Sequence, residues 1–228
     1  MNFRIHSLLY FATGILFIVL ENTGVFYPGI AVKALIIPIL IWMYLRFISG
    51  GRGNAFHRTI LFALVFSWIG DVTLQLTSFS EDFFLVGLAS FLVAQLLYLL
   101  AFFSTRGPNY LFFRRVYLIL PVLLYGVFLI WFLGEGLGDM KLPVTVYAVV
   151  ILTMLLAAMN RKEKVNPLSY QLVLIGAMLF VLSDSMIALN KFKQSFELAR
   201  IAIMSSYITA QYLITLGCLR QFNLTLKK

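Results

Sequence analysis

The sequence is dominated by long apolar stretches that alternate with short polar segments. An α-helix rises about 1.5 Å per residue and the hydrocarbon core of a membrane is about 30 Å thick, so roughly twenty apolar residues suffice to cross it. The intervening segments contain glycine, proline and asparagine, which interrupt helices. We therefore predict an all-α polytopic membrane protein with eight transmembrane helices, at residues 5–21, 29–48, 57–77, 83–103, 115–133, 141–159, 167–189 and 199–220.

The composition agrees with a membrane protein. Of the 228 residues, 61% are hydrophobic and 12% are charged, about half the charged fraction of a soluble domain. No polar segment is long enough to form a separate aqueous domain, so residues 1–228 are expected to form a single integral membrane domain. The net charge of +9 comes from basic residues in short clusters between apolar stretches, which argues against a nucleic-acid partner.

The distribution of lysine and arginine predicts the orientation. Of the 18 basic residues, 13 fall on one side of the predicted helices: Arg4, Arg46, Arg52, Arg58, Arg106, Arg114, Arg115, Arg161, Lys162, Lys164, Arg220, Lys227 and Lys228. The other five are Lys33, Lys141, Lys191, Lys193 and Arg200. Basic residues concentrate in cytoplasmic loops. Both termini are therefore predicted to be cytoplasmic, which requires an even number of helices.

Two aspartates, Asp71 and Asp184, interrupt the third and seventh apolar stretches. A carboxylate near the centre of a bilayer costs about 3 kcal/mol on insertion scales, and such residues usually face a protein cavity and mark function. From the predicted helix starts, Asp71 lies about 21 Å and Asp184 about 24 Å along its helix. Both are therefore expected in the outer third of the membrane.

Other ionisable groups are predicted at a similar depth. Lys33 lies about 6 Å from the outer end of its helix, and Glu21 ends the first stretch. Together with the aspartates they suggest a shared polar pocket open to the outer leaflet. Two simpler interpretations remain: Lys33 extends to the interface, and Glu21 is a helix-end residue in water. His6 and His57 lie at the cytoplasmic ends and are expected to be interfacial.

Neutral polar residues accompany the aspartates. Ser67 and Gln75 are four residues either side of Asp71, so all three share one helix face. Further polar groups in the fourth and eighth stretches are Gln95, Tyr98, Tyr207 and Gln211. Such groups commonly hydrogen-bond one transmembrane helix to another, which is the structural alternative to substrate binding.

The two halves of the chain also show a weak similarity. Asp71 is followed by Gln95 in the next helix, and Asp184 is followed by Gln211 in the next. Gly70 aligns with Ser183. An offset of four helices would make the halves a 4+4 parallel repeat, with both aspartates on the same side of the membrane.

Four motifs resemble those of the YhhN family, whose animal members include the TMEM86 lysoplasmalogenases. They are Ser67-x-x-Gly70-Asp71-x-x-Leu74, Gly87-x-x-x-Phe91-x-x-x-Gln95-x-x-Tyr98, Gly176-Ala177-x-x-Phe180-x-x-Ser183-Asp184 and Tyr207-x-x-x-Gln211. Lys33 is similar to a lysine of the family. Two positions depart from its pattern: Gln95 replaces an expected histidine, and Ala34 an expected proline. Gln95 cannot relay a proton as an imidazole does.

The resemblance implies hydrolysis of the vinyl ether bond of a lysoplasmalogen to a fatty aldehyde and a glycerophospho-alcohol. It implies Asp71 and Asp184 as the catalytic acid and base, as two carboxyls act in glycoside hydrolysis. The substrate would be a membrane lysophospholipid with a vinyl ether chain, contacted by Lys33, Ser67, Gln95, Tyr98, Ser183, Tyr207 and Gln211. Its head group is expected near Lys33, Tyr98 and Tyr207, and Lys33 would bind the phosphate or keep one aspartate ionised.

No set of histidine, cysteine and acidic residues has the spacing of metal ligands, so no metal and no cofactor is expected. No obligate protein partner is expected either. The protein would lie in the inner membrane of a bacterium or the endoplasmic reticulum of a eukaryote. A proton-coupled transporter is the alternative class, because carriers also combine parallel repeats with intramembrane acids. A non-catalytic lipid-binding scaffold is the third.

Overall fold

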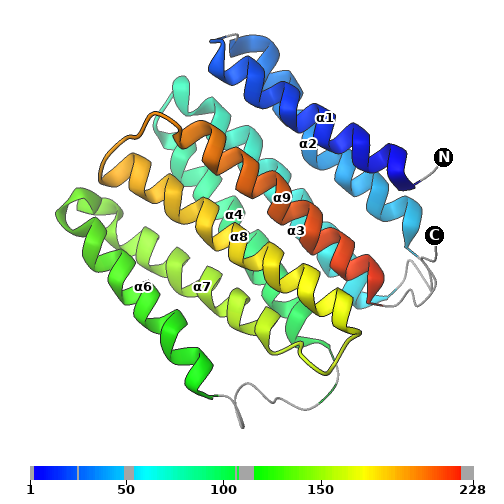
Figure 1. Cartoon of the computed structure of the whole chain (residues 1–228). Helices are drawn as coiled ribbons and strands as arrows, with labels where there is room; N and C mark the ends of the chain where they lie inside the picture. Colours follow the sequence, from blue (N-terminus) through cyan, green and yellow to red (C-terminus); the bar gives the residue numbers. More distant parts are fainter. Residues whose placement is uncertain (1–2, 25, 49–53, 106, 108–115, 222–228) are drawn as a thin grey trace. The chain divides into compact units, whose positions relative to one another are not determined.

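The computed structural model describes residues 3–24, 26–48, 54–105, 107 and 116–221. These residues are helical apart from short connections (Figure 1). The α-helices are α1 (Phe3–Asn22), α2 (Phe26–Phe47), α3 (Ala55–Gln75), α4 (Asp82–Phe103), α6 (Ile119–Leu133), α7 (Lys141–Met159), α8 (Pro167–Phe192) and α9 (Ala199–Arg220). Three 3-10 helices join them: η1 (Leu76–Ser78), η2 (Val116–Leu118) and η3 (Gly134–Met140).

The predicted all-α class is confirmed, and each predicted stretch coincides with a helix. Seven helical segments of the described residues are long and apolar enough to cross a membrane, one fewer than predicted. The difference arises in residues 116–159, which form one apolar run of 44 residues and contain both α6 and α7. Several basic residues used to predict the orientation lie outside the described part of the chain: Arg52, Arg106, Arg114, Arg115, Lys227 and Lys228.

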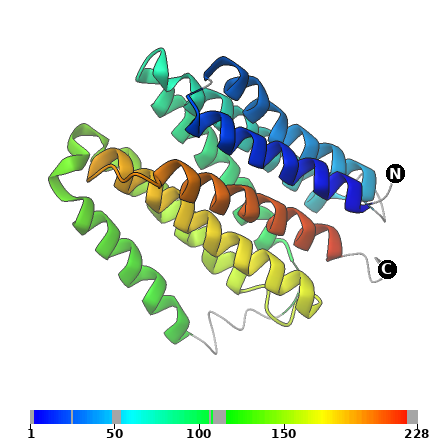
Figure 2. The same ribbon diagram turned by 45° about the horizontal axis from the view of Figure 1, so that its top comes forward.

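The chain divides into two compact units, at Tyr98 and Leu99. In the first unit, α1 packs against α2 and α2 against α3 (Figure 1). In the second, α8 lies between α7 and α9, and α6 packs against α7. Figure 2 shows α8 and α9, in yellow to red, running beside each other along their length.

Local sequence explains where several helices begin and end. The side chain of Asn54 caps α3 by accepting a hydrogen bond of 3.0 Å from the backbone N–H of Phe56. Asn166 caps α8 in the same way, and Pro167 follows at the first helical position, where its missing N–H costs nothing. Between α6 and α7, Gly134 and Gly138 adopt φ angles of +51° and +47°, which favour glycine.

Glycines also set how closely helices approach one another. A Cβ on Gly70 of α3 would lie 2.6 Å from the ring of Phe91 on α4, and one on Gly87 of α4 would lie 2.6 Å from Leu74. In the second unit, a Cβ on Gly176 of α8 would lie 2.9 Å from the carbonyl oxygen of Ala210 on α9. Small residues allow this close packing of transmembrane helices.

His6 and His57 lie in the first turns of α1 and α3, as predicted, but both side chains are buried. His6 packs against the ring of Trp42, with centroids 4.2 Å apart. The Nδ1 of His57 and the hydroxyl of Tyr44 are 2.8 Å apart and share a hydrogen bond between α2 and α3. Aromatic partners and a phenol thus replace the water that an interfacial imidazole would contact.

Arg161, which we assigned to a cytoplasmic loop, is also fully buried. Its guanidinium donates hydrogen bonds to Ser169 Oγ at 3.1 Å and Gln221 Oε1 at 2.8 Å, and it lies 5.3 Å from the ring centroid of Phe102. Ser169 in turn donates to the carbonyl oxygen of Gly217 on α9. This arginine therefore joins the α7–α8 connection to the start of α8 and to the residue that follows α9.

Candidate functional site

Asp71 lies in the first unit, on the buried face of α3. Its side chain is 3% exposed, and Ser67, one turn earlier, is fully buried. Gln75 is one turn later on the same face, at the end of α3. The three residues form a row of polar side chains along an otherwise apolar helix, as the spacing predicted.

Gln75 connects two charged residues from neighbouring helices. Its Oε1 accepts a hydrogen bond of 3.2 Å from the ammonium of Lys33 on α2, and its Nε2 donates one of 3.1 Å to the carboxylate of Glu21 on α1. The Lys33 ammonium also lies 5.5 Å from the ring centroid of Phe17. Lys33 is 8% exposed, so it does not extend to the interface in this structure. Glu21 lies at the end of α1 and is partly exposed, as the helix-end interpretation expects, but it also takes part in this network.

A proline five residues after Lys33 explains one further contact. Pro38 lies inside α2 and has no N–H to donate to the carbonyl of Ala34, four residues earlier. The indole N–H of Trp68 on α3 donates to that carbonyl at 2.8 Å. Freed backbone groups in membrane helices need such a partner. This bond fixes α3 against α2 one residue from Lys33 and one turn from Asp71.

Gln95 and Tyr98 of α4 are fully buried in the first unit. Among the described residues, Gln95 has no hydrogen-bond partner for either amide atom, and Ser67 has none for its hydroxyl. Leaving a buried polar group unsatisfied costs about 1–3 kcal/mol. Such groups are usually satisfied by water or a ligand, so these two side chains are candidates for contacting one.

Asp184 lies in the second unit and is more exposed than Asp71. Its Oδ2 accepts a hydrogen bond from the hydroxyl of Tyr147 on α7. The next residue, Ser185, accepts a bond of 2.7 Å from the hydroxyl of Tyr125 on α6. Sequence analysis missed both tyrosines, although a phenol six residues into a predicted span is a recognisable polar signal.

A small cavity of about 40 Å³ lies beside Asp184. Its lining comes from α6, α7 and α8, and includes Tyr125, Tyr147, Asp184 and Ser185 among apolar side chains. A volume of this size holds about one water molecule. The carboxylate of Asp184 therefore adjoins a space with two phenols and a hydroxyl on its walls.

The remaining predicted residues of the second unit, Ser183, Tyr207 and Gln211, lie on α8 and α9. Ser183 donates to the carbonyl oxygen of Ile203 at 3.1 Å. The Nε2 of Gln211 donates to the hydroxyl of Tyr207 at 3.3 Å, and the ring of Tyr207 meets that of Phe180 edge-on. The contacts of Ser183 and Phe180 join α8 to α9, which is the structural alternative to substrate binding, whereas the bond between Gln211 and Tyr207 lies within α9. Ser183 points to α9, whereas Asp184 bonds to α7.

The described residues contain no group of three or more histidine, cysteine, aspartate or glutamate side chains placed to hold a metal ion. The candidate residues therefore fall into two groups, one described in each unit. Around Asp71 there is a charged network with buried, unsatisfied amide and hydroxyl groups. Around Asp184 there are phenols and a small cavity.

These features define a class, the polytopic α-helical membrane proteins that hold ionisable side chains inside their helices. Comparison with known proteins gives the family. A model of the YhhN family matches residues 29–218, and the chain belongs to that family. No solved structure matches this chain.

Several relatives are named lysoplasmalogenases. Lysoplasmalogenase TMEM86B of Sus scrofa is 34% identical over 189 residues, which cover 83% of this chain and 74% of the relative. The Homo sapiens TMEM86B is 35% identical over 159 residues, covering 69% of this chain and 62% of the relative. A lysoplasmalogenase of Mycobacterium tuberculosis is 30% identical over 163 residues, 71% of this chain and 60% of the relative. The chain thus spans less than two thirds of the human and mycobacterial proteins.

Proposed function

We propose that this protein is a membrane-embedded lysoplasmalogenase. It would hydrolyse the vinyl ether bond of a lysoplasmalogen to a fatty aldehyde and a glycerophospho-alcohol. The observation that carries the proposal is its membership of a family whose relatives bear that name, combined with a buried carboxyl group on α3 and a hydrogen-bonded, partly exposed one on α8. In this proposal Asp71 and Asp184 are the two catalytic groups.

The proposed reaction uses the two carboxyl groups as acid and base. One carboxylic acid protonates the β-carbon of the vinyl ether, which leaves an oxocarbenium ion at the carbon that bears oxygen. The other carboxylate accepts a proton from water as its oxygen attacks that carbon and forms a hemiacetal. The second carboxyl group then gives this proton to the ether oxygen, while the first carboxylate takes the proton of the hemiacetal hydroxyl, and the C–O bond breaks to release aldehyde and alcohol. One water is consumed, and both carboxyl groups return to their starting states.

The surrounding side chains have proposed supporting roles. Lys33, through Gln75, balances negative charge next to Asp71, while Tyr147 orients the carboxylate of Asp184. The unsatisfied groups of Ser67 and Gln95 bind water or the polar part of the substrate. The other proposed substrate-binding residues are Tyr98, Ser183, Tyr207 and Gln211. No step requires Gln95 to carry a proton.

The test is hydrolysis by purified protein in detergent. Asp71→Asn and Asp184→Asn should each lower kcat/KM for a vinyl ether lysolipid at least a hundredfold, the scale of a lost general acid or base. Asp139→Asn is the matched control, because this aspartate is exposed in η3. Saturated alkyl ether and acyl lysolipids should release no aldehyde. Full activity in both folded site variants would refute the mechanism.

We also propose that α6 and α7 each cross the membrane, which gives eight spans, a 4+4 repeat, a single membrane domain and cytoplasmic termini. Glu135, in the turn between them, and Lys162, after α7, are both exposed. A cysteine at residue 135 should then react with an impermeant thiol reagent only from outside, and one at residue 162 only from inside. The native Cys218 is buried and should not react with the reagent. Labelling of both positions from one side would exclude eight spans.

A further inference from the structure

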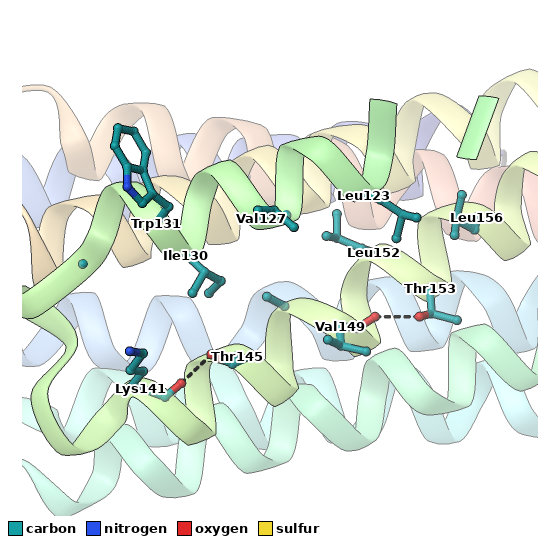
Figure 3. Close-up of a pocket in the computed structure, with 13 residues that line it drawn as sticks. Leu123, Val127, Ile130, Trp131, Lys141, Thr145, Val149, Leu152, Thr153 and Leu156 are labelled. Carbon is teal, nitrogen blue, oxygen red and sulfur yellow. Dashed lines mark hydrogen bonds between the residues drawn. The ribbon is translucent and has the colours of Figure 1, made fainter. Parts of the chain in front are cut away.

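A long apolar groove lies between α6 and α7 (Figure 3). It has a volume of about 560 Å³, within the range of sites that hold small ligands. Apolar side chains of both helices line it, among them Leu123, Val127, Ile130, Val149, Leu152 and Leu156. The Cβ that Gly126 lacks would lie 2.5 Å from Leu152, so this glycine lets the two helices touch at the floor of the groove.

The polar groups of the groove are arranged unevenly. Thr145 and Thr153 turn their hydroxyls to backbone carbonyls of their own helix, at 2.6 Å each, which leaves the walls apolar (Figure 3). Lys141, the first residue of α7, is the charged side chain among the described lining residues. In Figure 3 it lies at the same end as Trp131. Cationic and amphipathic aromatic side chains mark the level of lipid head groups.

The groove adjoins the cavity of Asp184. Ile130, Ala148 and Leu152 line both spaces. Both distances along α7 are counted from Lys141. Tyr147, which bonds to Asp184, is six residues or about 9 Å away, and Leu156 is about 22 Å away. A lipid with its phosphate at Lys141 would therefore place the start of its chain at the level of Asp184 and the rest along the groove.

We propose that the α6–α7 groove holds the alkyl chain of a lysophospholipid substrate, with the phosphate on Lys141, and leads it from the bilayer to Asp184 and Tyr147. This inference rests on the proposed function and names where its substrate binds. A single chain fits because the groove is one channel between two helices. Lys141 is exposed and can pair with a phosphate. The ammonium of Lys33 already bonds to Gln75 and contacts Phe17, so we assign it to charge balance instead.

The test is photolabelling of the full chain in nanodiscs. The probe is a saturated alkyl ether lysophospholipid with a diazirine midway along its chain. The proposed reaction does not consume this probe, because it has no vinyl ether double bond. Labelled peptides should map to α6 and α7. Val127→Trp, which fills the groove, should reduce this labelling at least fivefold, whereas Leu124→Trp, on an exposed part of α6 outside the lining, should leave it unchanged. Equal labelling of all exposed helices would overturn the proposal.

Two further arms test the head group and the source of the lipid. Lys141→Gln should lower labelling by the lysophospholipid about tenfold and spare a neutral alkylglycerol probe, while Lys191→Gln, outside the groove, changes neither. If a diacyl phospholipid probe labels the groove as strongly as the single-chain probe, the groove holds bulk lipid and the proposal is wrong. Labelling needs no turnover. A groove that labels as expected in a protein without hydrolysis would refute the proposed function alone, and hydrolysis without groove labelling would refute the groove alone.

Discussion

The two intramembrane aspartates are held by different chemistry. Asp71 is almost completely buried, one turn from a glutamine that joins the ammonium of Lys33 to the carboxylate of Glu21. Asp184 is more exposed and is held by the neutral hydroxyl of Tyr147, beside a cavity. Charges balance one another in the first region, and phenols supply the hydrogen bonds in the second. Two acids with similar sequence contexts therefore have different surroundings.

The two regions also differ in the atoms that the glycines of closely packed helices face. Gly70, adjacent to Asp71, faces the flexible ring of Phe91. Gly176, eight residues before Asp184, faces the carbonyl oxygen of Ala210 and the backbone nitrogen of Ile214. The α3–α4 contact therefore has a side chain that can move, and the α8–α9 contact meets rigid backbone. The two glycines also lie at different sequence distances from their aspartates.

The largest expected effect concerns charge balance in the first region. Lys33→Met removes the charged donor to Gln75, which also bonds to Glu21, and should lower the free energy of unfolding by about 3 kcal/mol, the upper end of the range for a hydrogen bond to a charged group. Thermal unfolding in detergent measures it. Adding Glu21→Gln should recover more than half of the loss. If the double variant is no more stable than the single one, the charges do not balance each other.

The next largest expected effect concerns the two glycine contacts, and it compares the two regions by their loss of unfolding free energy. Gly176→Ala should lower the free energy of unfolding by about 2–3 kcal/mol, because the facing backbone of α9 cannot move aside. Gly70→Ala should lower it by about 1–2 kcal/mol, because the ring of Phe91 can move. Unfolding midpoints of the two variants check the order. Gly70→Ala combined with Phe91→Leu should regain stability, because the smaller side chain makes room. Equal costs, or no recovery, would contradict the distinction between side chain and backbone.

In the second region, Tyr147→Phe should lower kcat/KM about thirtyfold, which corresponds to about 2 kcal/mol for a hydrogen bond to a charged group. Tyr125→Phe is the matched control, because it removes a phenol that bonds to Ser185 and not to Asp184. Its kcat/KM should change less than threefold. Equal losses in the two variants would assign the effect to packing and not to the orientation of Asp184.

The smallest expected effect tests the bond beside Pro38. Trp68→Phe removes the donor to the Ala34 carbonyl and should cost about 1 kcal/mol in unfolding free energy. In a Pro38→Ala background the helix supplies its own N–H, so the same substitution should cost less. A double-mutant cycle measures the coupling. Additive effects would show that the indole is not the substitute for the missing backbone bond.

Sequence patterns predicted much of the helical architecture and part of the site. The row Ser67, Asp71 and Gln75 on one face of α3 followed from the helical repeat. The bridge from Lys33 through Gln75 to Glu21 did not, since it depends on how α1, α2 and α3 pack. Tyr147 was missed for the same reason: tyrosines are common in membrane helices, and only the packing of α7 on α8 distinguishes this one.

The sequence by itself determined the helices, because apolar length and the hydrogen-bonding demands of a membrane leave few alternatives to a helix. It also marked Asp71 and Asp184, because a carboxylate among apolar residues is costly wherever the helix is placed. Tertiary structure alone decided which neighbours those acids meet, that Arg161 and both histidines are buried, and that α6 and α7 leave a groove between them. Such contacts join residues far apart in the chain, and the shapes of several side chains fix them jointly.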